Sequence, residues 1–95
     1  MIGEKVIVRT YSAGVHYGTL KSREGKECEL TDSIRIWSWS GACSLSQLAR
    51  EGVKKPDECK FAMTIPRILL TEAIEIIPCS LAATKNLEEV PSWKN

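Results

Sequence analysis

The stretch IRIWSW at residues 34–39 alternates between two kinds of side chain, which is the pattern of a half-buried β-strand. Successive side chains of a strand point to opposite sides of its sheet. One side of this strand then carries Ile34, Ile36 and Ser38, and the other carries Arg35, Trp37 and Trp39. Because the second side joins a cation to two indole rings, we take this segment as the centre of the interpretation.

The residues ahead of this segment predict three more strands, each rich in β-branched or apolar side chains. They are expected at residues 5–11, 15–22 and 27–31. The turns that join them are expected at Ser12–Gly14, at residues 23–26 and at Asp32–Ser33. A glycine inside the second strand, Gly18, predicts a β-bulge or the close approach of another group.

The residues that follow predict short helices as well as strands. Ser44 and Gln47 form a capping-box pattern at the start of a helix that ends before Gly52. A polar loop at 53–60, a strand at 61–65 and a helix from Ser80 to about Glu89 complete the pattern, and Pro66 predicts either an edge strand or a break. Residues 68–78 fit a strand better than a helix, because Glu72 to Ile76 alternate. The predicted fold is β-rich α+β, a twisted antiparallel sheet or small open barrel with one or two short helices.

Length and composition limit the class of protein. The 95 residues fit a single domain, 1–95, whose small core would gain from assembly into a homo-oligomer. Thirteen basic and twelve acidic residues leave a net charge of +1, which argues against a general nucleic-acid-coating role. The N-terminus lacks the pattern of a signal peptide, and apolar runs are far shorter than a membrane span. We therefore expect a cytoplasmic protein without a membrane partner.

The reactive residues of the chain do not form a catalytic or metal-binding pattern. The four cysteines, at 28, 43, 59 and 79, are widely and irregularly spaced, as expected of core residues or free thiols in a reducing compartment. His16 is the only histidine, and no nucleophile or orienting partner can be placed beside it. The sequence therefore predicts no enzyme, no metal site and no cofactor.

Two segments are candidates for binding a ligand. Trp37 and Trp39 form either a stacking platform for a base or a part of the core or a subunit interface. Arg35, on the same side, would meet a phosphate or stack on a ring. The second segment, residues 9–16, is either a ligand loop, whose turn amides hold an anion, or a structural hairpin corner. The predicted ligand-binding residues are Arg9, Tyr11, Ser12, Ala13, Gly14, His16, Arg35, Trp37 and Trp39.

Four blocks of the sequence resemble a family of small proteins of tailed bacteriophages and prophages. They are VIVRTYSAGVHYGTL, RIWSWSGACSLSQLAREGV, ILLTEAIEIIPCS and VPSWK. In size and character the chain is also similar to the phage sponge proteins that counter the Thoeris defence system. Those proteins assemble as oligomers and hold cyclic ADP-ribose isomers without cleaving them, and some also hold the cyclic oligonucleotides of CBASS immunity. The resemblance implies that Arg9, the Ser12–Gly14 turn, Arg35, Trp37 and Trp39 line the pocket.

Two function hypotheses follow. In the first, the protein is an anti-defence protein that sequesters a cyclic nucleotide signal in the cytoplasm of the infected bacterium. In the second, it is a host-takeover module that binds a host protein or nucleic acid through a small β-barrel. Exposed edge strands would serve the second hypothesis by pairing with a strand of the partner.

Overall fold

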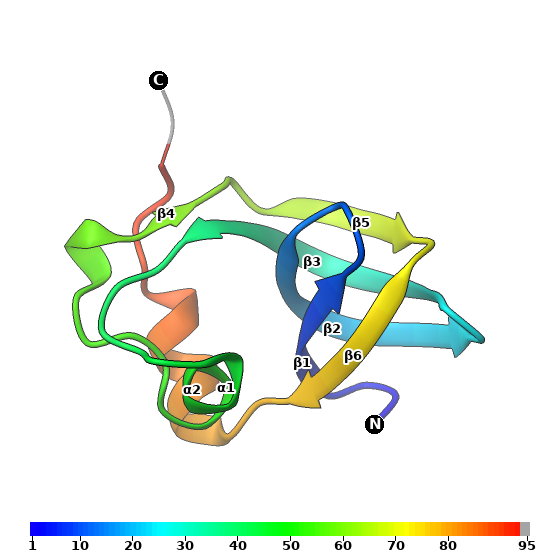
Figure 1. The fold of residues 1–95 in the computed structure, drawn as a ribbon, viewed down its shortest axis with the longest axis horizontal. Helices are drawn as coiled ribbons and strands as arrows, with labels where there is room; N and C mark the ends of the chain where they lie inside the picture. Colours follow the sequence, from blue (N-terminus) through cyan, green and yellow to red (C-terminus); the bar gives the residue numbers. More distant parts are fainter. Residues whose placement is uncertain (94–95) are drawn as a thin grey trace.

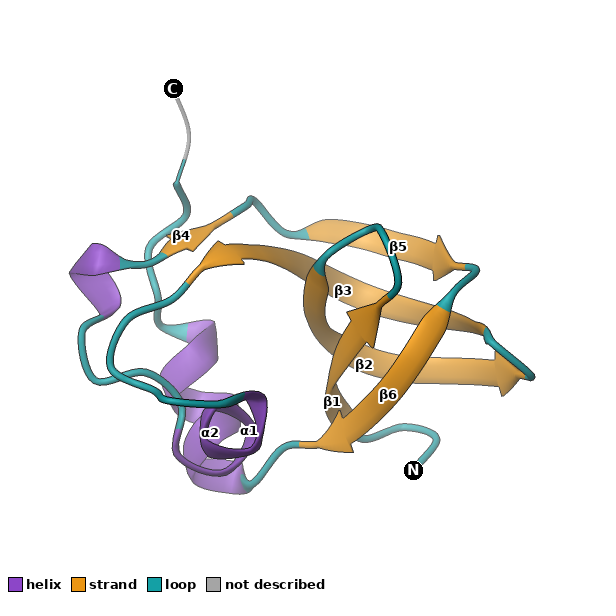
Figure 2. Cartoon of the chain, viewed as in Figure 1, coloured by secondary structure: helices purple, strands orange, loops and turns teal. Residues whose placement is uncertain are grey.

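The computed structural model describes residues 1–93, which form one curved antiparallel sheet and two short α-helices (Figures 1 and 2). The strands are β1 (Lys5–Thr10), β2 (Val15–Glu24), β3 (Glu27–Ser38), β4 (Lys60–Phe61), β5 (Ile65–Leu70) and β6 (Ala73–Pro78). The helices are α1 (Leu45–Glu51), α2 (Leu81–Glu88) and a 3₁₀ turn at Pro56–Glu58. The predicted fold class is confirmed. Neither α-helix is both long enough and apolar enough to cross a bilayer within these residues.

The sheet is open. Its strand order is β4-β3-β2-β1-β6, and β5 joins the outer edge of β3 beside β4. In Figure 1, β1 and β6 run steeply across the β2–β3 pair, so the sheet curls round its inner side. No strand pairing connects β5 to β6 within residues 1–93, so the curl is not closed into a barrel.

Strand β3 is longer than predicted. The expected turn at Asp32–Ser33 is wrong, because β3 runs without a break from Glu27 to Ser38. Asp32 adopts a left-handed conformation, with φ of 49°, inside the strand. Aspartate tolerates this conformation better than most residues. The polar pair that suggested a turn is therefore an irregularity within one strand, and β3 pairs along both of its edges.

The glycine in β2 lies where the chain needs one. The pairing of β2 with β3 shifts register between Tyr17 and Thr19, and the extra residue of this bulge lies in β3, opposite Gly18. A Cβ atom at Gly18 would lie only 3.1 Å from the backbone oxygen of Thr31. The two strands thus approach closely at Gly18, as the second predicted alternative had it, and a Cβ atom there would require Thr31 to shift by a few tenths of an ångström.

Two hydrophobic cores lie on the two sides of the sheet. The helix-side core packs the helices and the 52–61 segment against the sheet, and its buried members are Ile7, Tyr17, Ile36, Leu48, Ala49, Val53, Cys59, Phe61 and Leu87. The inner core fills the curl, and its buried members are Val6, Val8, Leu20, Cys28, Leu30 and Leu70. The alternation of β1 explains this division, because Ile7 belongs to one core and its two neighbours belong to the other.

Both α-helices begin at a serine cap, as predicted. The backbone N–H of Gln47 donates to Ser44 Oγ at 3.1 Å, and that of Ala83 donates to Ser80 Oγ at 3.0 Å. The reciprocal bond of a capping box is displaced by one residue, because Gln47 Oε1 accepts from the backbone N–H of Cys43. The side chain of Asn86 in α2 then joins the helices, since it exchanges two hydrogen bonds with the backbone of Val53, at 2.8 and 2.9 Å.

The preference for strand over helix at residues 68–78 is confirmed, although the segment contains a break. Residues 71 and 72 separate β5 from β6, and the two strands take opposite places in the sheet order. Pro66 lies inside β5 instead of ending a strand there. Proline is tolerated at this place because β5 is an edge strand, whose outer backbone groups need no partner strand.

Candidate functional site: a groove at the ends of β2 and β3

The turn between β1 and β2 is held by a threonine. Thr10 Oγ1 donates to the backbone oxygen of Gly14 at 2.7 Å and accepts from the backbone N–H of Ala13 at 2.8 Å. Gly14 has φ of +85°, a conformation that favours glycine. One of the amides that the sequence offered to an anion, that of Ala13, is therefore already bonded within the turn.

The end of β3 lies beside this turn because β2 and β3 pair there. The register sets Val15 opposite Ile36 and His16 opposite Arg35. The Trp37 side chain is 59% exposed, and the Arg35 guanidinium carbon lies 5.8 Å from the centre of the indole ring. This contact is within the range of a cation–π interaction and leaves much of the ring accessible.

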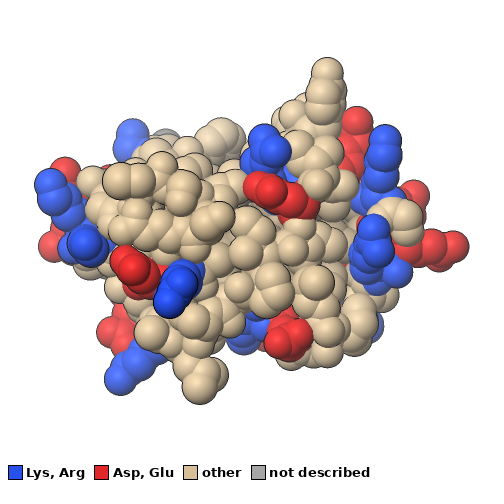
Figure 3. Space-filling model, turned by 60° about the horizontal axis from the view of Figure 1, so that its bottom comes forward, with Lys and Arg blue, Asp and Glu red and all other residues tan. Residues whose placement is uncertain are grey.

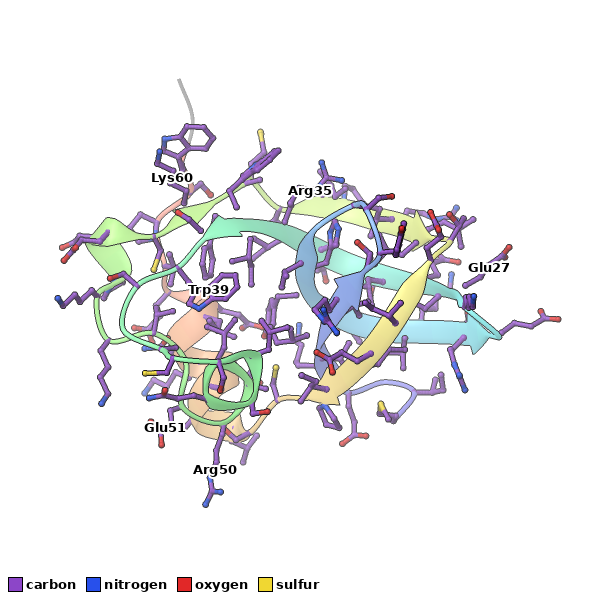
Figure 4. The ribbon with its side chains drawn as sticks, in the orientation of Figure 1. Glu27, Arg35, Trp39, Arg50, Glu51 and Lys60 are labelled. Atoms are coloured by element: carbon purple, nitrogen blue, oxygen red, sulfur yellow. The ribbon has the colours of Figure 1, made fainter. Side chains whose placement is uncertain are left out.

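Strict alternation predicted that Trp39 lies on the same side of β3 as Arg35 and Trp37, but it does not. It is half-buried and packs against the helix-side core, and Figure 4 shows its ring on the side of β3 that faces α1. The cause is local, since the pairing of β3 with β4 shifts register between Ile36 and Ser38 and the strand ends at Ser38. The core alternative for Trp39 is therefore the one that the structure adopts, while part of the side chain remains accessible.

The turn between β1 and β2 and the end of β3 together line a groove of about 370 Å³. Its lining contains six of the nine predicted residues: Ser12, Ala13, Gly14, Arg35, Trp37 and Trp39. Val15 and Ile36 complete the lining. Segments that are 20 residues apart in the sequence thus meet in one depression, with a turn on one wall and a cation and two indoles on the other.

The other three predicted residues do not line this groove. Arg9 lies on the opposite edge of β1, where its Nε donates to Glu75 Oε1 of β6 at 3.1 Å. Tyr11 projects into solvent with 77% of its surface exposed. His16 is completely buried behind the turn. The sequence around Arg9 and Tyr11 does not indicate that an ion pair with β6 would hold the first, or that the turn would expose the second, away from the groove.

His16 is fixed in one orientation. Its Nε2 lies 2.9 Å from the backbone oxygen of Ala13, and because a carbonyl only accepts, Nε2 carries the proton of the neutral ring. Burial lowers the pKa of His16 and the nearby Arg35 charge lowers it further, against the opposing effect of the Ala13 bond. The ring is therefore neutral at pH 7, and its Nδ1 is a hydrogen-bond acceptor.

A second, smaller cavity adjoins the groove on the inner side of the sheet. Its volume is about 210 Å³, and its lining residues are His16, Ser33, Arg35, Trp37, Ala62, Met63, Ile65 and Ile68. We call it the inner cavity. It shares Arg35 and Trp37 with the groove, so these two side chains border both hollows.

Three lining residues of the inner cavity have a buried polar atom without a hydrogen-bond partner in residues 1–93. These atoms are His16 Nδ1, Ser33 Oγ and Arg35 Nε. Each such atom costs the folded state about 1–3 kcal/mol when nothing bonds it. A fourth atom, Glu29 Oε2, forms no well-aligned hydrogen bond but lies 2.9 Å from Arg67 Nε, so an ion pair compensates it. Sequence reasoning missed Ser33, because it was assigned to a turn.

A larger hollow, of about 520 Å³, lies at the other end of the inner side. It is lined mainly by Met1, Ile2, Leu20 and residues 73–76, and its charged members are Arg23 and Glu75. Glu75 is already paired with Arg9. We place the candidate site at the groove and the inner cavity, because polar groups with free hydrogen-bonding capacity gather there.

The thiols lie apart from this site. Cys28 and Cys59 are buried, Cys79 is half-buried and Cys43 is exposed, and all four are free. Burial raises the pKa of Cys79 to about 11 and also raises that of Cys28. These two thiols are therefore protonated at neutral pH. Within the described part of the chain no three His, Cys, Asp or Glu side chains gather as a metal site would require.

Comparison with known families places this chain. The model of a family described as a domain of unknown function, DUF6948, matches residues 3–87. The chain belongs to the DUF6948 family. The DUF6948 match covers every strand and nearly all of α2, so both the groove and most of its supporting core lie within the family's domain. Searches of curated proteins and of solved structures gave no significant match.

Proposed function

We propose that this protein binds a nucleotide in the groove and holds it without chemical change. The observation that carries the proposal is the exposed Trp37 ring, with the Arg35 guanidinium beside it and the Ser12–Gly14 turn across the groove. An accessible indole face stacks on any base and contributes about 1–3 kcal/mol per base. A guanidinium can hold a phosphate through two hydrogen bonds.

The resemblance to phage sponge proteins supplies the ligand class and the biological role. On this proposal the ligand is a cyclic ADP-ribose isomer or a cyclic oligonucleotide that serves as an immune signal. The protein acts in the cytoplasm of the infected bacterium and lowers the free concentration of the signal by binding it. A homo-oligomer would enclose the site further, because apolar side chains at the rim of the inner cavity, among them Met63 and Ile65, are exposed.

Holding rather than cleavage is supported by the chemistry of the lining. The groove residues include no carboxylate, thiol or histidine among those that the structure describes. His16 is buried behind the turn with one nitrogen bonded to Ala13. A general base must reach the proton that it removes, and His16, with its free Nδ1, lines the inner cavity and not the groove.

The surface charge fits a small ligand better than a nucleic-acid backbone. On the face that Figure 3 shows, basic and acidic side chains lie in small mixed groups around a broad uncharged area. The net charge of +1 agrees with this distribution. Binding to a nucleic acid through many phosphates would require a concentrated basic surface.

The experiment is a depletion assay with a panel of cyclic ADP-ribose isomers and cyclic di- and trinucleotides. The purified protein is incubated with the panel and retained on a filter, and both the filtrate and the heat-released ligand are analysed by mass spectrometry. We expect one member to leave the filtrate and to return intact on heating. A cleaved product would contradict the holding role, and no depletion would overturn the nucleotide proposal in favour of pull-downs with host lysate.

Substitution then tests the place of binding. Trp37→Ala should weaken the affinity about 5- to 150-fold, because it removes the stacking face. Tyr11→Ala is the matched control, since Tyr11 is an equally exposed aromatic residue next to the turn but outside the groove. It should change the affinity by less than about twofold. Equal effects of the two substitutions would show that the groove is not the binding site.

A further inference from the structure

The inner cavity is the polar end of an otherwise apolar compartment. His16 pairs in register with Val8 on one side and with Arg35 on the other, so the three side chains share the inner side of the sheet. Ser33 lies two residues from Arg35 on β3 and shares that side too. The inner core therefore continues into a region where histidine, serine and arginine replace valine and leucine.

These three side chains offer complementary hydrogen-bonding groups. His16 is 0% exposed and Ser33 is 1% exposed. Because Nε2 is hydrogen-bonded to the backbone oxygen of Ala13, the free Nδ1 of His16 can only accept a hydrogen bond. Arg35 Nε only donates, and the Ser33 hydroxyl does either. The wall thus presents an acceptor and a donor from neighbouring strands, with one adaptable group beside them.

The remaining walls are mainly apolar. They come from Trp37, Met63, Ile65 and Ile68. The volume of 210 Å³ corresponds to about seven water molecules at the ~30 Å³ that each occupies in the liquid. It is smaller than the roughly 300–1,000 Å³ of a pocket for a drug-sized ligand. A single ring system matches this size.

We propose that the inner cavity is a subsite for a planar ring that carries a hydrogen-bond donor next to an acceptor, as the amide or amidine edge of a nucleobase does. The donor of the ligand ring donates a hydrogen bond to His16 Nδ1, and its acceptor accepts one from the N–H of Arg35 Nε. Ser33 Oγ forms a hydrogen bond with the group of the ligand that lies next to these two. A carboxylate is attracted by the Arg35 charge but is disfavoured at His16, because both of its oxygens are acceptors and one of them would face the lone pair of the ring.

This inference rests on the proposed function and extends it. Arg35 and Trp37 border both the inner cavity and the groove. On this proposal a nucleotide places its ring in the inner cavity and its phosphate past these side chains, toward the Ser12–Gly14 turn. Met63 and Trp37 are largely exposed, and as rim residues they leave a way in for the ring. The base edge is then selected by the inner cavity, while the groove holds the charged remainder.

The test uses three small probes and the whole protein. Adenine and benzamide each carry a donor beside an acceptor, whereas benzoate has the shape of benzamide but lacks the donor. Titration of ¹⁵N-labelled protein should show that adenine and benzamide shift the amide signals of Ser33 and Arg35. Benzoate should bind at least about tenfold more weakly than benzamide, as expected when one buried hydrogen bond is lost.

Two substitutions separate binding from folding. Ser33→Ala removes a hydroxyl that has no partner in the free protein, so folding is kept while the affinity for adenine falls about three- to tenfold. His16→Gln keeps a donor for Ala13 but removes the ring acceptor, and it should weaken adenine at least about tenfold. Ser22→Ala, an exposed serine of the same sheet, is the control and should leave the affinity unchanged.

Each outcome decides the proposal. Failure of adenine and benzamide to bind, equal binding of benzoate, or unchanged affinity of Ser33→Ala would overturn the subsite and leave ordered water as the partner of these atoms. The cyclic-nucleotide panel tests the proposed function separately. Probe binding without binding of any cyclic nucleotide would overturn that function and keep the subsite, and the reverse result would overturn the subsite alone.

Discussion

On the helix side of the sheet the polar groups are bonded in pairs, whereas at the polar end of the inner side three groups are left open. Tyr17 donates from its hydroxyl to Glu88 at 2.6 Å, and Lys5 lies 3.2 Å from the same carboxylate. Asn86 uses both ends of its amide on Val53. By contrast, His16, Ser33 and Arg35 each keep an unbonded buried atom within residues 1–93. The two regions belong to one small domain and differ in what they are built to contact.

The difference distinguishes buried polar groups that stabilise the fold from buried polar groups that are available to a ligand. A buried polar group that stabilises a fold has its partner in the same chain, as on the helix side. A polar group kept open in the interior weakens the fold, and proteins accept this weakness mainly where another molecule supplies the missing bond. Substitutions on the two sides should therefore have opposite consequences for stability and binding.

The largest loss of stability is expected from Asn86→Ala. The change removes two hydrogen bonds and leaves the buried N–H and C=O of Val53 without partners, which should cost about 2–4 kcal/mol. Urea denaturation measures the free energy of unfolding. Lys85→Ala, at the exposed neighbouring position of α2, should stay within about 0.5 kcal/mol of the parent protein. Similar values for the two variants would remove the contrast between the regions.

A smaller, pH-dependent loss is expected from Glu88→Gln. The Tyr17 hydrogen bond and the Lys5 charge lower the pKa of Glu88 against the effect of burial. Because the pKa in the folded state lies below the unfolded value, the charged form stabilises the fold above about pH 4.5, and this contribution disappears as the pH falls through the folded pKa.

The carboxylate is partly exposed, so the difference between Glu88→Gln and the parent should be about 0.5–1 kcal/mol at pH 7. It should shrink as the pH falls below about 4.5 and disappear once Glu88 is protonated in the folded state. Unfolding curves at several pH values check both statements, with Glu89→Gln as the neighbouring control. A difference that stays constant with pH would show that the charge of Glu88 has no part in stability.

The smallest change in stability is expected from Ser33→Ala. Since its hydroxyl is unbonded in the free protein, the free energy of unfolding should stay within about 0.5 kcal/mol or rise slightly. Thr10→Val provides the contrast, because the Thr10 hydroxyl makes two hydrogen bonds in the turn and its loss should cost about 1–2 kcal/mol. A loss in Ser33→Ala as large as that in Thr10→Val would show that Ser33 is a structural residue.

Local chemistry predicted most of the elements. Caps at Ser44 and Ser80, the close approach at Gly18 and the alternation of β1 and β2 depend on neighbours in the sequence, and the sequence displays them directly. The Asp32–Ser33 turn was mistaken because a turn and an irregular strand residue favour the same side chains. The pairing of β3 with β2 and with β5 on both sides of Asp32 decides between them.

The candidate site was predicted in part. Only the resemblance placed the turn and the end of β3 in one pocket, and the register of β2 with β3 does set them beside the same groove. Trp39 was placed on the wrong side because the bulge opposite β4 depends on a later segment. Arg9 was predicted to line the site but forms an ion pair with Glu75 of β6 instead. Ser33 lines the inner cavity together with residues of β5, which follow it by more than 30 positions in the sequence. Periodicity within one strand contains none of this information.

The double pairing of β3 has a consequence for synthesis on the ribosome. One edge of β3 can pair with β2, which is synthesised before it, but most of the other edge can pair only after β5 has been synthesised. Thirty-two residues separate the end of β3 at Ser38 from the end of β5 at Leu70, and at about 5–20 residues per second their translation takes roughly 2–6 s. During that interval the nascent chain presents an unpaired strand edge. Glu29, Asp32 and Arg35 put charges along it, and such charges discourage association with other nascent chains.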